Sequence, residues 1–192
     1  MKKATPEQKL KELIVYISSK CASDPKYGKT KLNKILFFSD FLYYQKKLKP
    51  ISEVKYRHLP YGPVPDDIDK LIKTMLGKDI DVAYVTSGRY TKHKFFAKRE
   101  ADLSSFEPAM IAHVDSIIED VCGENSMTGT QLSDLTHEES IGYIVTSQGQ
   151  EIPYSTVFLK DKRYQKATVW EKEKAKELAK EFAGQYGYPT AS

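Results

Sequence analysis

The sequence of 192 residues contains few of the residues, and none of the short motifs, on which most catalytic and metal sites depend. It has two cysteines, four histidines and one tryptophan. It has no glycine-rich nucleotide-binding loop, no HExxH zinc motif and no CxxC pair. Cys21 and Cys122 lie far apart and match no metal or redox motif, which indicates reduced thiols in a cytosolic protein. We therefore predict no catalytic residue, no cofactor and no metal site.

Strong charge of one sign and long apolar runs are also missing. The net charge of +4 is mild, whereas dedicated nucleic-acid-binding domains carry a strongly basic face. No run approaches the roughly 20 apolar residues that span a membrane. The first residues lack the apolar stretch of a signal peptide. We expect a cytoplasmic protein that contacts neither membrane nor nucleic acid, and the sequence defines no oligomeric state.

Tyrosine, by contrast, is abundant, with 13 residues. A tyrosine side chain offers apolar area and a polar tip, which suits half-buried surfaces that meet partners. Tyrosine can also simply replace phenylalanine at the edge of a core. The count alone leaves both interpretations open.

The most distinctive stretch is KLNKILFFSDFLYY, at residues 31–44. Placed on a helix, its apolar side chains fall on both sides, and a helix that is apolar nearly all round is usually buried. We predict a central core helix that Thr30 caps. The PYGPVP segment at residues 60–65 predicts a rigid turn, because its three prolines fix φ and Gly62 permits a backbone shape that other residues resist.

The rest of the chain alternates helical and extended patterns. Thr5 is predicted to cap a first helix that has Pro6 at its first position. The expected elements are a helix from Pro6 to Cys21, a strand at 54–59, a helix from Pro65 to Leu76, a β-hairpin of 80–86 with 93–98, a helix that starts after Ser104 or Ser105 and ends at Gly123, short helices at 129–136 and 137–146, a loop with an extended segment at 149–159, a basic loop at 160–166 and a helix from Thr168 to Ala183.

These elements predict an α+β fold class that is mostly α-helical. Residues 1–167 are expected to form one compact domain with a small β-hairpin. Residues 168–192 are expected to add a peripheral C-terminal helix and a frayed tail.

Two features of the central helix need an explanation. Lys29, Lys31 and Lys34 crowd its start, where the helix dipole disfavours cations. Either they are solvated, or they face an acidic partner or acidic side chains elsewhere in the fold. Asp40 lies among apolar residues and needs partners if it is buried. We interpret it as a structural residue that accepts hydrogen bonds from a neighbouring loop, with a catalytic base of raised pKa as the alternative.

A third feature is the segment LSDLTHEES. Thr136, with Glu139 three residues later, predicts a capping box, a structural role that requires no chemistry of His137. Residues 128–146 also imitate a helix-turn-helix. The second helix of that motif would begin with two acids and no Arg or Lys, so phosphate would repel it.

These segments together resemble a known family, the Panacea or SocA-like antitoxin domain. KLNKILFFSDFLYYQKKLKPISEVKYRHLPYGPVPDDIDKLI resembles the family's KLxKLLY-type helix, aromatic-rich stretch, YGPV segment and following helix. LSDLTHEESIGYIVTSQGQEIPYS resembles its LS-x-x-TH segment with a later bulky residue, glycine and Ile-Pro turn. The resemblance covers residues 10 to about 160. Tyr143, and Tyr56 with His58, stand where the family often has Trp, which places this chain in a divergent branch.

The resemblance implies a mostly helical domain without catalytic residues that acts as an antitoxin. Its partner would be a cognate toxin protein encoded beside it, neutralised by direct binding or by delivery to a protease. Two alternatives remain: a DNA-binding regulator of its own operon, and a hydrolase built on Asp40 with His58 or His137.

We expect partner contacts at the start of the central helix and around the PYGPVP turn, although the turn can also be purely architectural. The predicted contact residues are Lys29, Lys31, Lys34, His58, Tyr61, Gly62 and Pro63. The residues predicted to be structural are Asp40, Thr136 and His137.

Overall fold

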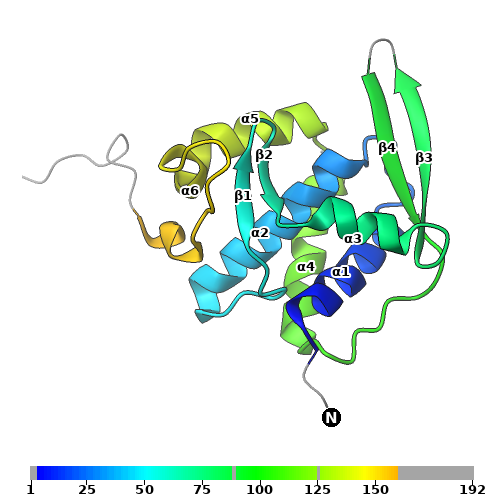
Figure 1. Ribbon diagram of the computed structural model, residues 1–192, viewed down its shortest axis with the longest axis horizontal. Helices are drawn as coiled ribbons and strands as arrows, with labels where there is room; N and C mark the ends of the chain where they lie inside the picture. Colours follow the sequence, from blue (N-terminus) through cyan, green and yellow to red (C-terminus); the bar gives the residue numbers. More distant parts are fainter. Residues whose placement is uncertain (1–3, 88–89, 125, 160–192) are drawn as a thin grey trace, which may run out of the picture. The chain divides into compact units, whose positions relative to one another are not determined.

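The computed structural model describes residues 4–87, 90–124 and 126–159 of the chain. The predicted basic loop at 160–166, the predicted helix from Thr168 to Ala183 and the tail lie outside these residues. The elements, shown in Figure 1, are α1 (Pro6–Lys20), α2 (Lys29–Lys47), β1 (Tyr56–Leu59), β2 (Gly62–Pro65), α3 (Ile68–Met75), β3 (Ile80–Ser87), β4 (Tyr90–Ala97), α4 (Pro108–Cys122), α5 (Gly129–Glu139), α6 (Ile141–Ile144) and the 3-10 helix η1 (Tyr154–Phe158).

Helix α2 is the buried central helix that the sequence predicts. Its buried side chains lie on all sides of the helix, among them Leu32, Ile35 and Phe41. The prediction that Thr30 caps it is wrong. The helix starts two residues earlier, at Lys29 after Gly28, and no side chain caps its first turn.

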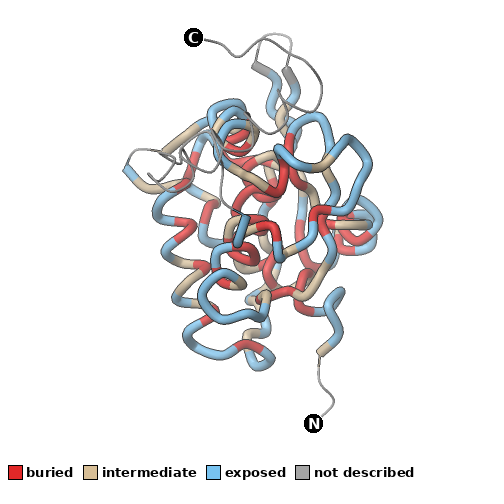
Figure 2. Tube along the Cα trace, turned by 90° about the vertical axis from the view of Figure 1, so that its left-hand side faces the viewer, coloured by how far each residue is buried: buried red, intermediate tan, exposed pale blue. Residues whose placement is uncertain are grey.

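Two clusters of buried side chains explain why α2 is apolar nearly all round. The main core joins α2 to α1, α3 and α4, for example through Leu36, Leu13 and Val114. In a second, aromatic cluster, Phe37 and Phe41 of α2 pack against Tyr56 of β1. Figure 2 shows the buried residues gathered in the interior of the described part. Because α2 contributes to both clusters, its only exposed residues are Leu42 and residues 45–47 at its C-terminal end.

The prediction that the whole PYGPVP segment is a turn is wrong. The segment forms the turn and the second strand of a β-hairpin. Strand β1, which the sequence predicts, pairs with β2 in antiparallel register, with Tyr56 opposite Pro65 and Leu59 opposite Gly62. Only Pro60 and Tyr61 lie in the turn. Prolines fit in β2 because it pairs with β1 along one side only, so their missing N–H groups break no second ladder.

The other edge of β1 is covered by the extended segment at 149–152. The His58 N–H donates to the Gln150 carbonyl at 2.9 Å, and the Ile152 N–H donates to the Tyr56 carbonyl at 2.8 Å. These hydrogen bonds place the segment beside β1. The exposed edge that β1 would otherwise present is therefore paired within the chain.

The predicted hairpin of β3 and β4 is present, with Ile80 opposite Ala97. Strand β4 packs against α1. The fold class is α+β and mostly helical, as predicted. The described residues contain two two-stranded sheets where the sequence predicted one hairpin. None of the described helices is long and apolar enough to cross a membrane.

Helix boundaries also differ from the prediction at α3, α5 and α6. Short helices are predicted at 129–136 and 137–146, whereas α5 runs from Gly129 to Glu139 and α6 covers only Ile141–Ile144. Helix α3 starts at Ile68, three residues later than predicted, because Pro65 belongs to β2 and Asp67 turns the chain with a positive φ of 56°. Thr136 does not cap a helix: it lies inside α5, and its Oγ1 donates to the Leu132 carbonyl. The capping box of α5 is instead formed by Thr128 with Gln131.

Candidate partner-binding site

The segments that carry the predicted contact residues meet at the turn between β1 and β2. Lys34 of α2 donates from Nζ to the Tyr61 carbonyl at 2.6 Å. Ser133 of α5 donates from Oγ to the same carbonyl at 3.0 Å. Two helices that are remote in sequence thus fix one peptide of the turn. We call this turn with Lys34, Ser133 and the aromatic residues described below the turn site.

Gly62 makes this close approach possible. Its φ is +103°, a conformation that favours glycine. A Cβ at this position would lie 1.7 Å from the Nζ of Lys34 and 3.9 Å from a methyl group of Thr136. A side chain at position 62 would therefore displace the Lys34 ammonium from beneath the turn.

Lys34 is the most unusual ionisable group of the site. Its side chain is 1% exposed. Burial lowers its pKa to about 7, because a charged ammonium loses its hydration there. The hydrogen bond to the Tyr61 carbonyl stabilises the charged form and so acts in the opposite direction. The turn is held by an amine that titrates near neutral pH.

Aromatic rings support the turn from the side of α5 and α6. The Tyr143 ring stacks against His58, with 3.6 Å between ring centroids, and against His137, with 4.6 Å. The Tyr143 hydroxyl donates to the Leu59 carbonyl at 2.8 Å. Burial lowers the pKa of His137, and the nearby charge of Lys34 acts in the same direction. The stack fixes the end of β1 just before the turn.

Above this fixed base, Tyr61 itself points outward. Its side chain is 79% exposed, and Leu59 beside it is also exposed. The predicted contact residues Gly62 and Pro63 are buried, and His58 is half-buried. The structure thus brings His58, Tyr61, Gly62 and Lys34 together and leaves Tyr61 as their most accessible member.

The other two lysines of the predicted set lie elsewhere and have acidic partners within the chain. Lys31 is buried and pairs with Asp24 at 2.5 Å, with further bonds to the Val121 carbonyl and Ser126. Lys29 pairs with Asp69 at 2.5 Å near the surface. Of the explanations left open, acidic side chains within the fold account for these two lysines. Because Lys31 and Lys34 are buried, a partner would reach them only after a rearrangement, and their role in binding stays a prediction.

Asp40 accepts hydrogen bonds from the loop that follows α2. The Ser52 N–H donates to it at 2.7 Å, the Ser52 hydroxyl also donates, and the Tyr56 hydroxyl donates at 2.8 Å. Burial raises its pKa, and these donors oppose the rise. None of its described hydrogen-bond donors is a histidine. The contacts fit the structural interpretation of Asp40.

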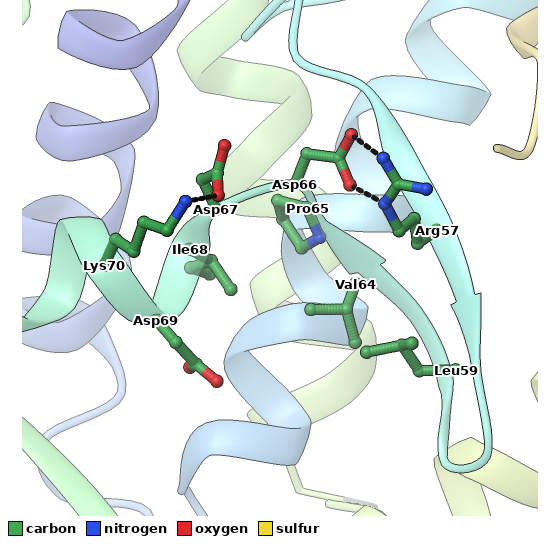
Figure 3. A pocket seen from close by; sticks show the side chains of 9 residues that line it. All are labelled: Arg57, Leu59, Val64, Pro65, Asp66, Asp67, Ile68, Asp69 and Lys70. Atoms are coloured by element: carbon green, nitrogen blue, oxygen red, sulfur yellow. Dashed lines mark hydrogen bonds and ion pairs between the residues drawn. The ribbon is translucent and has the colours of Figure 1, made fainter. Parts of the chain in front are cut away.

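A hollow of about 280 Å³ lies at the other end of the hairpin (Figure 3). Its three carboxylates each have a basic partner. Asp66 contacts the Arg57 guanidinium twice, at 2.6 and 3.2 Å. Asp67 pairs with Lys70, and Asp69 pairs with Lys29. These ion pairs lie where the chain returns from β2 into α3, and each carboxylate that lines the hollow is paired with a basic side chain.

Two other kinds of site, a metal centre and a helix-turn-helix, can be compared with the described residues. Within the described ranges, no three His, Cys, Asp or Glu side chains lie close enough together to hold a metal ion. The would-be recognition helix of the helix-turn-helix is α6, which has four residues. A single helical turn is too short to place several side chains along a DNA groove.

The fold and the turn site define a small, mostly helical domain in which donors from two helices hold a turn that carries the exposed Tyr61. In comparisons with known proteins, the model of the family described as antitoxin SocA-like, Panacea domain, matches residues 32–141. This match covers more than half of the chain, so the chain belongs to that family, as its sequence resemblance predicted. No curated protein and no solved structure matches it.

Sequence reasoning missed Ser133 and Asp24, which bind the predicted contact residues Tyr61 and Lys31. Ser133 gave a signal, because it is the serine of the LS-x-x-TH segment, but nothing local indicated its bond to Tyr61. Asp24 gave none, since it lies in a loop that reads as solvated and is in fact buried against Lys31.

Proposed function

We propose that this chain is an antitoxin that neutralises a cognate protein toxin by direct contact, and that Tyr61 is the central contact of that interface. The observation that supports this most is an exposed tyrosine on a turn whose backbone is held by two buried donors, Lys34 and Ser133. Membership of the antitoxin family supplies the class of partner.

Physical chemistry favours such a turn as a binding element. Binding energy in protein interfaces concentrates in a few large side chains, tyrosine prominent among them. A contact residue on a pre-ordered backbone loses little conformational entropy when it binds. Tyr61 combines both properties, and exposed Leu59 extends the apolar area next to it.

The proposed action is masking without chemistry. His58, Gly62 and Pro63 shape the turn from beneath Tyr61. Asp40 and His137 then serve the packing of the domain rather than a reaction.

The test is co-expression with the reading frame beside this gene. The wild-type chain is expected to restore growth and to co-purify with the toxin. Tyr61→Ala should weaken the complex by about 30-fold or more, which is the loss of a typical hot spot, with an unchanged Tm. Tyr84→Ala is the matched control, because Tyr84 is 65% exposed on the distant strand β3.

The outcomes separate the parts of the proposal. A neighbouring product that is harmless alone, or toxic in spite of the wild-type chain with no complex formed, would contradict the antitoxin function. Equal binding by Tyr61→Ala and the wild type would contradict the turn site. A fall in the amount of toxin, in place of a stable complex, would indicate delivery to a protease.

A further inference from the structure

The two cysteines, which no motif connects, lie side by side in the fold. Cys21 caps the C-terminal end of α1, and Cys122 is the last residue of α4. They are 101 positions apart in the sequence, and their Sγ atoms are 3.4 Å apart. Both are free thiols. A disulfide requires about 2.05 Å between the sulfurs, so a small movement of the side chains would bring them within bonding distance.

The surroundings of the pair differ for its two members. Cys21 is 1% exposed, whereas Cys122 is only partly buried and is the member that a small reagent can reach. The Lys31 ammonium lies 3.9 Å from the Cys122 Sγ. Contact with the Cys21 thiol, chiefly, and the charge of Lys31 lower the pKa of Cys122, while burial and Asp24 act against them. Contact with Cys122 and burial raise the pKa of Cys21. Cys122 is therefore the better nucleophile.

We propose that Cys21 and Cys122 form an oxidisable dithiol site in which hydrogen peroxide converts the two thiols into a disulfide. The Cys122 thiolate attacks one peroxide oxygen, the O–O bond breaks, and the departing hydroxide takes up a proton to become water. The product is a sulfenic acid on Cys122. Cys21 then attacks that sulfur, the S–O bond breaks, and the hydroxide leaves as water with the Cys21 proton.

The balance is two thiols and one peroxide giving one disulfide and two waters. Each sulfur loses one electron, and the peroxide accepts both. A cellular dithiol reductant reverses the reaction, as is usual for redox-sensing disulfides of cytosolic proteins.

The disulfide would tie the end of α1 to the end of α4. It would close a long loop that contains α2, both hairpins and α3, so it would restrict the unfolded chain strongly. Oxidation is therefore expected to stabilise the described fold. This inference rests on the thiols and their neighbours alone and does not depend on the proposed antitoxin function.

The test treats the purified full chain with one equivalent of hydrogen peroxide. The expected product is a monomer that lacks two hydrogen atoms in its intact mass, has no free thiol, regains both with dithiothreitol and melts on the order of 5–15 °C higher. Cys21→Ser should stop at a sulfenic acid on Cys122 that dimedone traps. Cys122→Ser should react at least about tenfold more slowly, since the thiol with the lower pKa is gone.

Two results would overturn the proposal. One is a wild-type chain that keeps both thiols, or that carries sulfinic or sulfonic acid without a disulfide. The other is a disulfide between two chains in place of the one within the chain. Both results come from the wild-type protein, so they hold even if a serine variant fails to fold.

Discussion

Replacement of Lys34 by methionine tests the chemistry of the turn site through the pH dependence of stability. Methionine keeps most of the volume of the side chain and removes its ionisable group. The Tyr61 carbonyl retains Ser133 as a donor, so the substitution leaves no unpaired acceptor at that peptide.

The size and sign follow from the two states of Lys34. Burial lowers its pKa from 10.5 to about 7 in the folded chain. Below pH 7 both states are protonated, and the folded state bears the full cost of about 5 kcal/mol, at 1.36 kcal/mol for each pKa unit. Between pH 7 and 10.5 the unfolded state binds more protons, so stability rises with pH. From pH 7 to 9 this rise amounts to about 2 kcal/mol, an upper bound because the hydrogen bond to Tyr61 offsets part of the burial.

The assay is urea denaturation of the wild type and Lys34→Met at pH 6, 7, 8 and 9. The difference between the two free energies of unfolding cancels groups that titrate in both proteins. It is expected to change by less than about 0.5 kcal/mol from pH 6 to 7 and to move by about 2 kcal/mol toward the wild type from pH 7 to 9. Parallel stabilities across this range would refute the assignment of a neutral-titrating, buried Lys34.

Three further substitutions test other contacts. Asp40→Asn should lower the free energy of unfolding by about 2–4 kcal/mol, because buried donors of Ser52 lose a charged acceptor; an unchanged value in urea would contradict the structural role. Gly62→Ala should destabilise more than Gly77→Ala, since both have positive φ but only position 62 meets another atom; equal Tm losses would contradict this. Tyr143→Phe should cost about 1 kcal/mol through its bond to the Leu59 carbonyl; calorimetry that detects no change would rule out that bond.

The sequence predicted those features that depend on local periodicity. The apolar residues of 31–44 indicated a helix buried all round, and α2 is one. The spacing of apolar residues in α4 and the extended patterns of β3 and β4 likewise predicted those elements. Strand β2 was missed because prolines at 63 and 65 read locally as a turn, whereas the fold pairs them along one side only.

The features that were not predictable depend on contacts between remote segments. The Thr136 capping box matched a real pattern, but α5 continues through Thr136 to Glu139, and the next helix begins after Ser140. The lysines near the start of α2 gave a local signal of misplaced charge and no sign of burial. The burial of Lys31 depends on Val121 and Ser126, about 90 positions away.

Lys34 is the feature that most favours a binding role for the turn. An apolar residue of similar volume at this buried position is expected to give equal or greater stability at pH 7, because the burial cost exceeds the roughly 1.5–3 kcal/mol of a charged hydrogen bond. A buried lysine that is expected to lower stability and also anchors the β1–β2 turn is best explained by what the turn does. Lys34→Met should therefore be as stable as the wild type at pH 7 and yet bind the toxin more weakly, because one of the two donors to Tyr61 is lost. Surface plasmon resonance with immobilised toxin measures this, and full affinity in the stable variant would show that the Lys34 anchor serves the fold alone.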